Sequence, residues 1–169
     1  SLAIIDALLS GEKKEHALGL MAESFHAAVK ARDFAERRGD DGAEEVFIAA
    51  LLKNIGEITF WCVAGEEGTQ IQDLMDTQNF SQKVAAQEDL GFTLEQLTVG
   101  LTRDWHLSDL LHSAINTPTL NNPRIKDIVL AIELSKTATK GWADKETIAV
   151  SNKVAAHLNV EKNKIVDLL

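Results

Sequence analysis

The chain has a single cysteine, Cys62, and this scarcity excludes an intramolecular disulfide. A lone cysteine is typical of a small buried side chain in a reducing compartment. A chain of 169 residues, 45% of them hydrophobic, can bury roughly 70% of the surface that its unfolded form exposes. We therefore expect one domain over residues 1–169 that needs neither a disulfide nor a structural metal.

Positive charge is also scarce, with 17 Lys and Arg against 26 Asp and Glu and a net charge of −9. This balance opposes the counterion release that drives nucleic-acid binding. The tightest basic groups, Lys13-Lys14 and Arg37-Arg38, are not interleaved with aromatic residues that could stack on bases. We expect neither nucleic acid nor a membrane surface as a partner.

Long apolar runs and targeting signals are not evident. No window approaches the length needed to cross a bilayer, and the first residues lack the succession typical of a signal peptide. We therefore expect a cytoplasmic protein.

Alternating polar and apolar runs are missing too, which excludes half-buried strands and predicts an all-helical chain. Glycine-rich and proline-containing breaks divide it into about seven or eight helical segments. The breaks are Gly39 to Gly42, Gly65 to Gly68, Gly91, Thr117 to Pro123, and Lys140-Gly141.

Two early helices are expected to form the core. The first, from about Glu12 to Arg38, carries an apolar stripe expected to face the core, with His26 on its flank. The stripe consists of Leu18, Met21, Phe25, Ala28 and Val29. The second, Ala43 to about Val63, is apolar nearly all round and is predicted to be central. On it, Asn54 is expected to bury its amide and to find hydrogen-bond partners.

Start and stop signals place the later helices. Thr93 followed by Gln96 predicts a capping box, Ser81 and Ser108 are expected N-caps, and Asn159 is an expected helix end. The last amphipathic segments are Ile125 to about Thr139, Asp144 to Leu158, and Glu161 to Leu169.

Motifs for common chemistry are absent: no phosphate-binding glycine loop and no nucleophile elbow occurs. Cys62 lies between apolar neighbours and is expected to be a packed, inert thiol. The acidic group around the start of the central helix lacks the spacing of a calcium loop and is expected to be a solvated turn that favours the helix dipole. It comprises Asp40, Asp41, Glu44 and Glu45.

The five histidines do not stand at metal-ligand spacing, since no pair is four residues apart. Asp109 and His112, three residues apart, are the best local ligand pair. We expect them to be an exposed acid and histidine.

The run from Ala49 to Gly56, AALLKNIG, resembles the central-helix motif of HD-superfamily proteins, and most closely the HDOD branch of bacterial signalling proteins. In the superfamily a His-Asp pair that binds the catalytic metal stands where Lys53-Asn54 stands here. Further similar stretches follow in the family's order over about residues 20 to 140. They are Phe25-His26-Ala27, Glu88 to Leu94, Trp105-His106-Leu107-Ser108, and Ile115-Asn116-Thr117-Pro118. The family's N-terminal helical portion is not recognised, so we expect a shortened member or a piece of a longer chain.

The resemblance implies an eroded metal site whose positions are His26, Lys53, Asn54, Leu94 and Pro118. Lysine repels a divalent cation, an amide replaces a carboxylate poorly, and leucine and proline ligate nothing. His26 alone cannot hold a metal. We therefore expect no catalytic residue, no metal and no cofactor.

These observations predict an all-α, compact orthogonal bundle of the HD type. The resemblance implies a non-catalytic bacterial signal-transduction or output module whose partner is another protein or a fused signalling domain. One alternative is a divergent metal-dependent phosphohydrolase that recruits His106, Asp109 and His112. Another is a sensor that binds a nucleotide or another anion in the vacated cleft between His26, Lys53 and Asn54.

Overall fold

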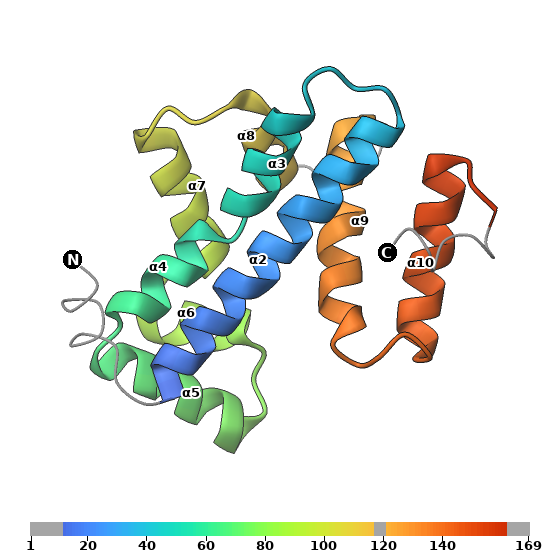
Figure 1. Ribbon diagram of the computed structural model, residues 1–169. Coiled ribbons are helices and arrows are strands. Elements are labelled where there is room, and N and C mark those ends of the chain that lie inside the picture. Colours follow the sequence, from blue (N-terminus) through green and yellow to red (C-terminus); the bar gives the residue numbers. More distant parts are fainter. Residues whose placement is uncertain (1–11, 117–120, 162–169) are drawn as a thin grey trace. The chain divides into compact units, whose positions relative to one another are not determined.

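The computed structural model describes residues 12–116 and 121–161, and the described part is helical without strands (Figure 1). The all-helical prediction is confirmed. The expected seven or eight helices agree with the structure once α3 and α4, predicted as one helix, are taken together. The helices are α2 (Glu12–Arg37), α3 (Ala43–Leu52), α4 (Ile55–Val63), α5 (Glu66–Gln78), α6 (Gln82–Leu90), α7 (Leu94–Asp104), α8 (Asp109–Asn116), α9 (Pro123–Ala138) and α10 (Lys145–Leu158).

The predicted capping signals stand at helix ends. The Thr93 hydroxyl accepts from the Gln96 backbone N–H at 3.1 Å, and the Gln96 side chain accepts from the Thr93 N–H at 2.8 Å. Ser81 and Ser108 accept backbone N–H groups of the first turns of α6 and α8. Asn159, at a φ of 54°, ends α10. Residues 162–169 of the last expected segment lie outside the described residues.

Thr93→Ala is expected to lower the free energy of unfolding by about 1 kcal/mol, because it leaves the Gln96 N–H without its capping oxygen. Thr93→Ser keeps the oxygen and is expected to recover most of that loss. Urea denaturation of the three proteins measures both effects. Equal stability of Thr93→Ala and the parent would contradict the capping role.

The predicted central helix is interrupted, and the prediction of one continuous helix was wrong. Lys53 and Asn54 form a turn, and Asn54 adopts φ −106° and ψ 20°, outside the helical region. A new helix then starts, with the Ile58 N–H donating to the Asn54 carbonyl at 3.0 Å. Asparagine and glycine have low helix propensity, so Asn54-Ile55-Gly56 is a weak point in an otherwise strongly helical run.

The turn at Lys53-Asn54 interrupts the long apolar segment Ala43–Val63. An 18-residue window of this segment has a mean hydropathy of 1.6, so the segment is long and apolar enough to cross a membrane by length and composition. The expectation that no window approaches that length was wrong. The turn divides the segment into helices of 10 and 9 residues. At about 1.5 Å per residue, each covers roughly half of a hydrocarbon core about 30 Å thick. Core helices of soluble proteins pass the same test, and 39% of this window is buried.

Helix α2 buries a different face from the one predicted. Leu18, Met21 and Phe25 are 50%, 40% and 57% exposed, so the expectation that their stripe faces the core was wrong, although Ala28 is buried. The buried face carries mostly small side chains: Ala17, Ser24, Ala27, Ala28, Ala31, Phe34 and Ala35. Alanines allow neighbouring helices to approach α2 closely, while Leu18, Met21 and Phe25 remain outside.

The contacts divide the chain into two compact units. Of the described residues, the first unit holds 12–22 and 54–107, and the second holds 23–53, 108–116 and 121–161. Within the first unit, α4 packs on α7 and α5 packs on α6. Its core is a cluster of buried side chains: Ala17, Phe60, Trp61, Ile71, Ala85, Ala86 and Leu94.

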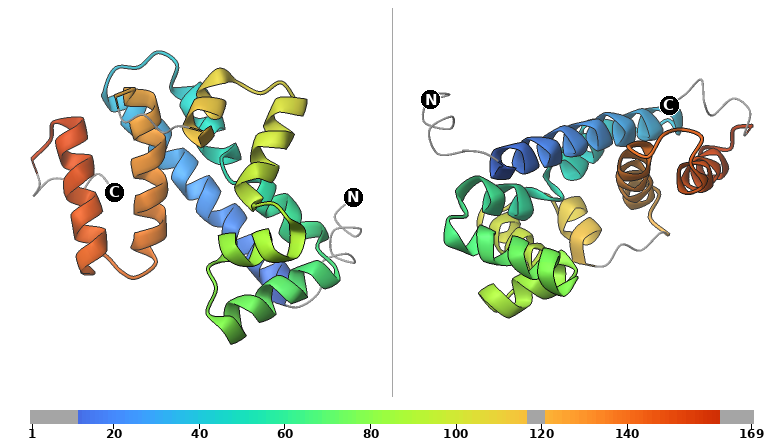
Figure 2. Two further views of the ribbon diagram at one scale, coloured as in Figure 1. Left: turned by 180° about the vertical axis from the view of Figure 1, so that it is seen from behind. Right: turned by 90° about the horizontal axis from the view of Figure 1, so that it is seen from below.

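The second unit is built on α9. This helix packs against α3, α8 and α10, and it runs antiparallel beside α10 (Figures 1 and 2). Its Asn122 N-cap accepts the Arg124 N–H at 3.0 Å, and Pro123 occupies the first helical position, where a missing N–H costs nothing. Seven of its sixteen residues are buried, among them Asp127.

Candidate functional site

Four of the five positions of the expected metal site lie in the described residues, and they are found on α2, in the turn between α3 and α4, and on α7. His26 lies on the second-unit part of α2 and is exposed, and its Nδ1 is 3.1 Å from the hydroxyl oxygen of buried Ser135 on α9. Partial burial, and then the charge of Lys30, lower the pKa of His26 below its ordinary value. The imidazole is thus held by α9 at the edge of the unit.

Lys53 and Asn54 form the turn between α3 and α4. Lys53 follows the last residue of α3, and Asn54 is the N-cap of α4 but accepts no capping hydrogen bond with its side chain. Asn54 is half-buried, less than the sequence led us to expect. Lys53 and Asn54, which the sequence resemblance aligns with the His-Asp pair, therefore lie where one helix ends and the next begins.

The side chain of Leu94 is part of the hydrophobic core of the first unit. The side chain is 5% exposed and belongs to the cluster that contains Trp61 and Ile71. Its carbonyl accepts the Thr98 hydroxyl at 3.1 Å, and that hydroxyl accepts the backbone N–H of Gly56 at 3.1 Å. A leucine in this place contributes packing and offers no ligand atom. Pro118 lies outside the described residues.

The alternative set of His106, Asp109 and His112 gains no support. Asp109 and His112 share α8, and Asp109 is exposed while His112 is half-buried. His106 adopts a φ of 53° and its Nδ1 is 3.0 Å from the Asp104 carbonyl. Across residues 12–116 and 121–161, no three His, Cys, Asp or Glu residues form a group that could hold a metal ion.

Cys62 is the packed thiol that the sequence predicted. It lies on α4, half-buried against the core cluster of the first unit. Burial raises the pKa of the Cys62 thiol, which disfavours the nucleophilic thiolate.

A network of charged side chains in the second unit was missed by the sequence reasoning. At its centre Asp127 is completely buried on α9. Its carboxylate accepts Nε of Arg38 at 3.1 Å, with Nη2 of Arg38 bound as well, and lies 2.7 Å from Nε2 of His157 on α10. The hydrogen bond that Arg38 donates to Asp127 is the main cause that raises the pKa of Arg38. Asp127 thereby ties the end of α2 and the end of α10 to α9.

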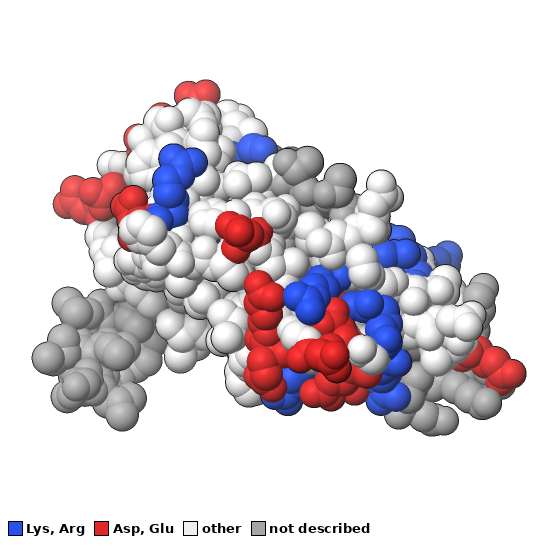
Figure 3. Space-filling view, turned by 90° about the horizontal axis from the view of Figure 1, so that it is seen from above, with Lys and Arg blue, Asp and Glu red and all other residues white. Residues whose placement is uncertain are grey.

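The network continues through Asp40. Its carboxylate accepts Nε and Nη2 of Arg124 at 2.8 and 2.6 Å and the Gly42 backbone N–H at 2.8 Å. Arg124 also donates to Glu45 at 3.0 Å. The expectation of a solvated acidic turn was wrong for Asp40, whose side chain is 10% exposed. Figure 3 shows acidic and basic side chains gathered where α2 ends and α3 and α9 begin.

Asp40 gives the protein an acid-sensitive contact. Hydrogen bonds from Arg124 lower the pKa of Asp40 from 3.8 to about 2. Because the folded pKa lies below the unfolded one, this contribution to stability is complete above pH 4 and is lost as the pH falls towards 2. Asp40→Asn is therefore expected to be less stable than the parent at pH 6 and to lose less stability between pH 4 and 2. Urea denaturation at each pH measures this difference, and parallel pH profiles would contradict it.

Similar proteins are found among solved structures. One is an HDOD domain protein of unknown function from Geobacter sulfurreducens, with a TM-score of 0.66 and 19% identity over 89% of this chain and 57% of that chain. Another is a candidate phosphohydrolase from Shewanella amazonensis SB2B, with a TM-score of 0.67 and 18% identity over 98% of this chain and 63% of that chain. The chain thus spans less than two thirds of either neighbour. No curated protein matches it.

The fold is that of HDOD domain proteins. The HDOD domain family matches residues 1–119, more than half of the sequence, and the chain belongs to this family. The predicted resemblance is confirmed. Helices α9 and α10 lie beyond the matched residues.

Proposed function

We propose that this domain is a non-catalytic bacterial signal-transduction or output module, located in the cytoplasm, that acts through contacts with a partner protein or an attached domain. The observation that carries the proposal is the occupancy of the HD positions. A buried core leucine, Leu94, stands in one of them, and a helix-breaking Lys53-Asn54 turn stands in place of the His-Asp pair. A metal-dependent hydrolase needs imidazole and carboxylate ligands at these places.

Two further observations support a role in contacts. The side chains of Leu18, Met21 and Phe25 are exposed, and their spacing places them on one face of α2. In the second unit, Asp127 also connects the end of α2 to α9 and α10 through Arg38 and His157. A displacement of the end of α2 would therefore be transmitted to both helices. Rigid helices joined by discrete polar contacts are a common means of passing a conformational signal.

The experiment that tests the proposal is a hydrolysis assay against generic phosphomonoester and phosphodiester substrates, with Mn²⁺, Ni²⁺ or Fe²⁺ added. We expect no turnover above that of the His26→Ala variant, which removes the one remaining ligand residue. Metal-dependent turnover that disappears in His26→Ala would overturn the proposal. It would favour the phosphohydrolase suggested by the neighbour from Shewanella.

A thermal-stability panel separates the module from a nucleotide or anion sensor. A ligand that binds the folded state raises the melting temperature, and the stabilisation grows with the logarithm of the ligand concentration once this exceeds Kd. We expect nucleotides and inorganic phosphate to leave the melting temperature unchanged. Stabilisation by a nucleotide that is lost in Lys53→Ala would establish the sensor instead.

A further inference from the structure

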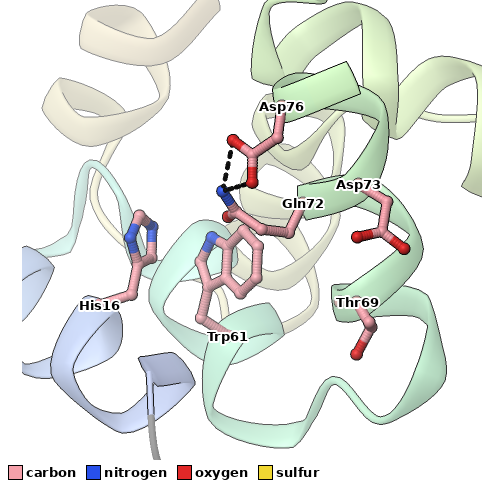
Figure 4. Close-up of a pocket in the computed structure, with 7 residues that line it drawn as sticks. His16, Trp61, Thr69, Gln72, Asp73 and Asp76 are labelled. Atoms are coloured by element: carbon pink, nitrogen blue, oxygen red, sulfur yellow. Dashed lines mark hydrogen bonds between the residues drawn. The ribbon is translucent and has the colours of Figure 1, made fainter. Parts of the chain in front are cut away.

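A surface pocket in the first unit is not explained by the function proposed above. It has a volume of about 340 Å³ and lies between the start of α2, the C-terminal half of α4 and one face of α5. Small-ligand pockets have volumes of roughly 300–1,000 Å³. None of the four HD positions that the structure describes lines the pocket. The side chains that line it are His16, Trp61, Thr69, Gln72, Asp73 and Asp76 (Figure 4).

Trp61 supplies the observation that points to a ligand. The side chain is 3% exposed, and its Nε1 is buried without a hydrogen-bond partner. Figure 4 shows the indole nitrogen on the edge of the ring that faces Gln72 and Asp76. The Gln72 amide nitrogen donates to both oxygens of Asp76, at 3.2 and 3.1 Å. A buried N–H donor without an acceptor costs about 1–3 kcal/mol, so an acceptor from outside would be favoured there.

The charge of the lining selects the kind of ligand. Asp73 and Asp76 contribute two carboxylates from one face of α5, and among the residues whose side chains the structure describes no lysine or arginine lines the pocket. The whole chain carries a charge of −9. Anions are therefore repelled and cations attracted. A bare metal ion has no acceptor to offer the indole N–H, whereas an organic cation can carry one.

The edge contact between His16 and Trp61 gives the pocket an aromatic wall. Their ring centroids are 4.6 Å apart at an angle of 61°. His16 comes from α2 and Trp61 from α4, so the wall joins two elements of the same unit. An aromatic wall opposite carboxylates suits an alkylammonium group, since the alkyl part contacts the rings while the charge reaches the acids.

We propose that this pocket binds a small organic cation that carries an oxygen acceptor, of which an amino alcohol is the simplest kind. The ammonium group lies against Asp73 and Asp76, and the ligand oxygen accepts the hydrogen bond from Nε1 of Trp61. Ligand binding in this pocket does not depend on whether the HD positions bind a metal, because none of the described HD positions lines it.

The experiment follows the indole N–H of Trp61 by ¹⁵N-edited NMR on the whole chain. The protein has three tryptophans, so three indole resonances are expected, and Trp105→Phe and Trp142→Phe identify the two that are exposed. The probes are 4-amino-1-butanol, n-butylamine without the oxygen, and 1,4-butanediol without the charge, at matched pH and chloride. We expect a saturable downfield shift of the Trp61 proton with the amino alcohol and markedly weaker binding of the other two.

Matched variants test the carboxylates. Asp73→Asn with Asp76→Asn is expected to raise the Kd for the amino alcohol by about tenfold or more, because the two charge-assisted bonds together contribute at least about 1.4 kcal/mol. Glu88→Gln with Asp89→Asn removes the same number of charges from exposed positions of α6 and is expected to leave the Kd unchanged.

Three results would overturn the proposal. The first is the absence of a saturable shift at millimolar amino alcohol in a protein whose spectrum remains folded. The second is equal binding of 1,4-butanediol. The third is an upfield shift of the free Trp61 proton in Gln72→Ala, since this would show that the Gln72 oxygen already accepts the bond in solution.

Discussion

Gly56→Ala is expected to lower the free energy of unfolding by about 3 kcal/mol, at the upper end of the usual cost of overpacking. A Cβ at this position would lie 2.4 Å from the backbone nitrogen of Thr98, 2.5 Å from its hydroxyl oxygen and 2.8 Å from the Leu94 carbonyl oxygen. Two of these atoms are backbone of α7, so α4 and α7 must move apart. Separation of the two helices would also break the hydrogen bond from the Gly56 N–H to the Thr98 hydroxyl.

Thermal and urea denaturation measure the loss, which corresponds to a fall in melting temperature of roughly 6–12 °C for a chain of this size. Gly100→Ala on α7 is the matched control, because nothing lies within 4 Å of its added Cβ. Alanine is the better helix former, so this variant is expected to be as stable as the parent or slightly more stable. If both variants behaved alike, the close approach of α4 to α7 would be contradicted.

Asp127→Asn is the second large effect, with an expected loss of about 3–5 kcal/mol, the usual cost of breaking a buried ion pair from one side. The substitution keeps the size of the side chain but removes the charge that faces Arg38 and His157. The guanidinium of Arg38, only 18% exposed, would keep its charge without its main partner. Urea denaturation gives the free energy of unfolding.

Asp41→Asn controls for the change in net charge, because Asp41 is exposed in the same turn as Asp40. We expect its effect to stay within about 0.5 kcal/mol. The double variant Arg38→Met with Asp127→Leu removes both charges. Its loss of stability is expected to be smaller than the sum of the losses measured for Arg38→Met alone and Asp127→Leu alone. Additive losses would show that Arg38 and Asp127 do not depend on each other.

Helix ends could be predicted from the sequence because capping is local. The hydroxyls of Ser81, Thr93 and Ser108 bond to N–H groups within three residues, so a short sequence window contains the whole interaction. The break at Asn54 could not be predicted in the same way. Nothing in the apolar pattern marks it, and the helix that restarts there is shaped by the contact of Gly56 with α7.

The incorrect prediction of which face of α2 is buried also has a physical reason. Periodicity gives weight to large apolar residues such as Phe25, whereas close helix packing favours the small side chains on the opposite face, such as Ala27 and Ala31. Size and burial therefore point in different directions on this helix. The exposed residues that result are the ones we connect with a contact function.

The Asp127 network left a signal that sequence reasoning passed over. Asp127 stands three and seven residues before Leu130 and Leu134, on the buried stripe of α9, where a charged residue requires a partner. His157 stands three and seven residues after Val154 and Val150, on the buried stripe of α10. A search for charges on apolar stripes would have found both. The partner Arg38 is 89 residues away from Asp127, so its pairing required the fold.

We propose that the HD positions of this domain bind no catalytic metal. The most direct test is the metal content of untagged protein purified from cultures supplemented with manganese, nickel and iron. We predict less than one equivalent of any of these metals, with the same trace amounts in His26→Ala. A stoichiometric metal that is lost in His26→Ala would contradict the account and make this HDOD domain a metalloprotein.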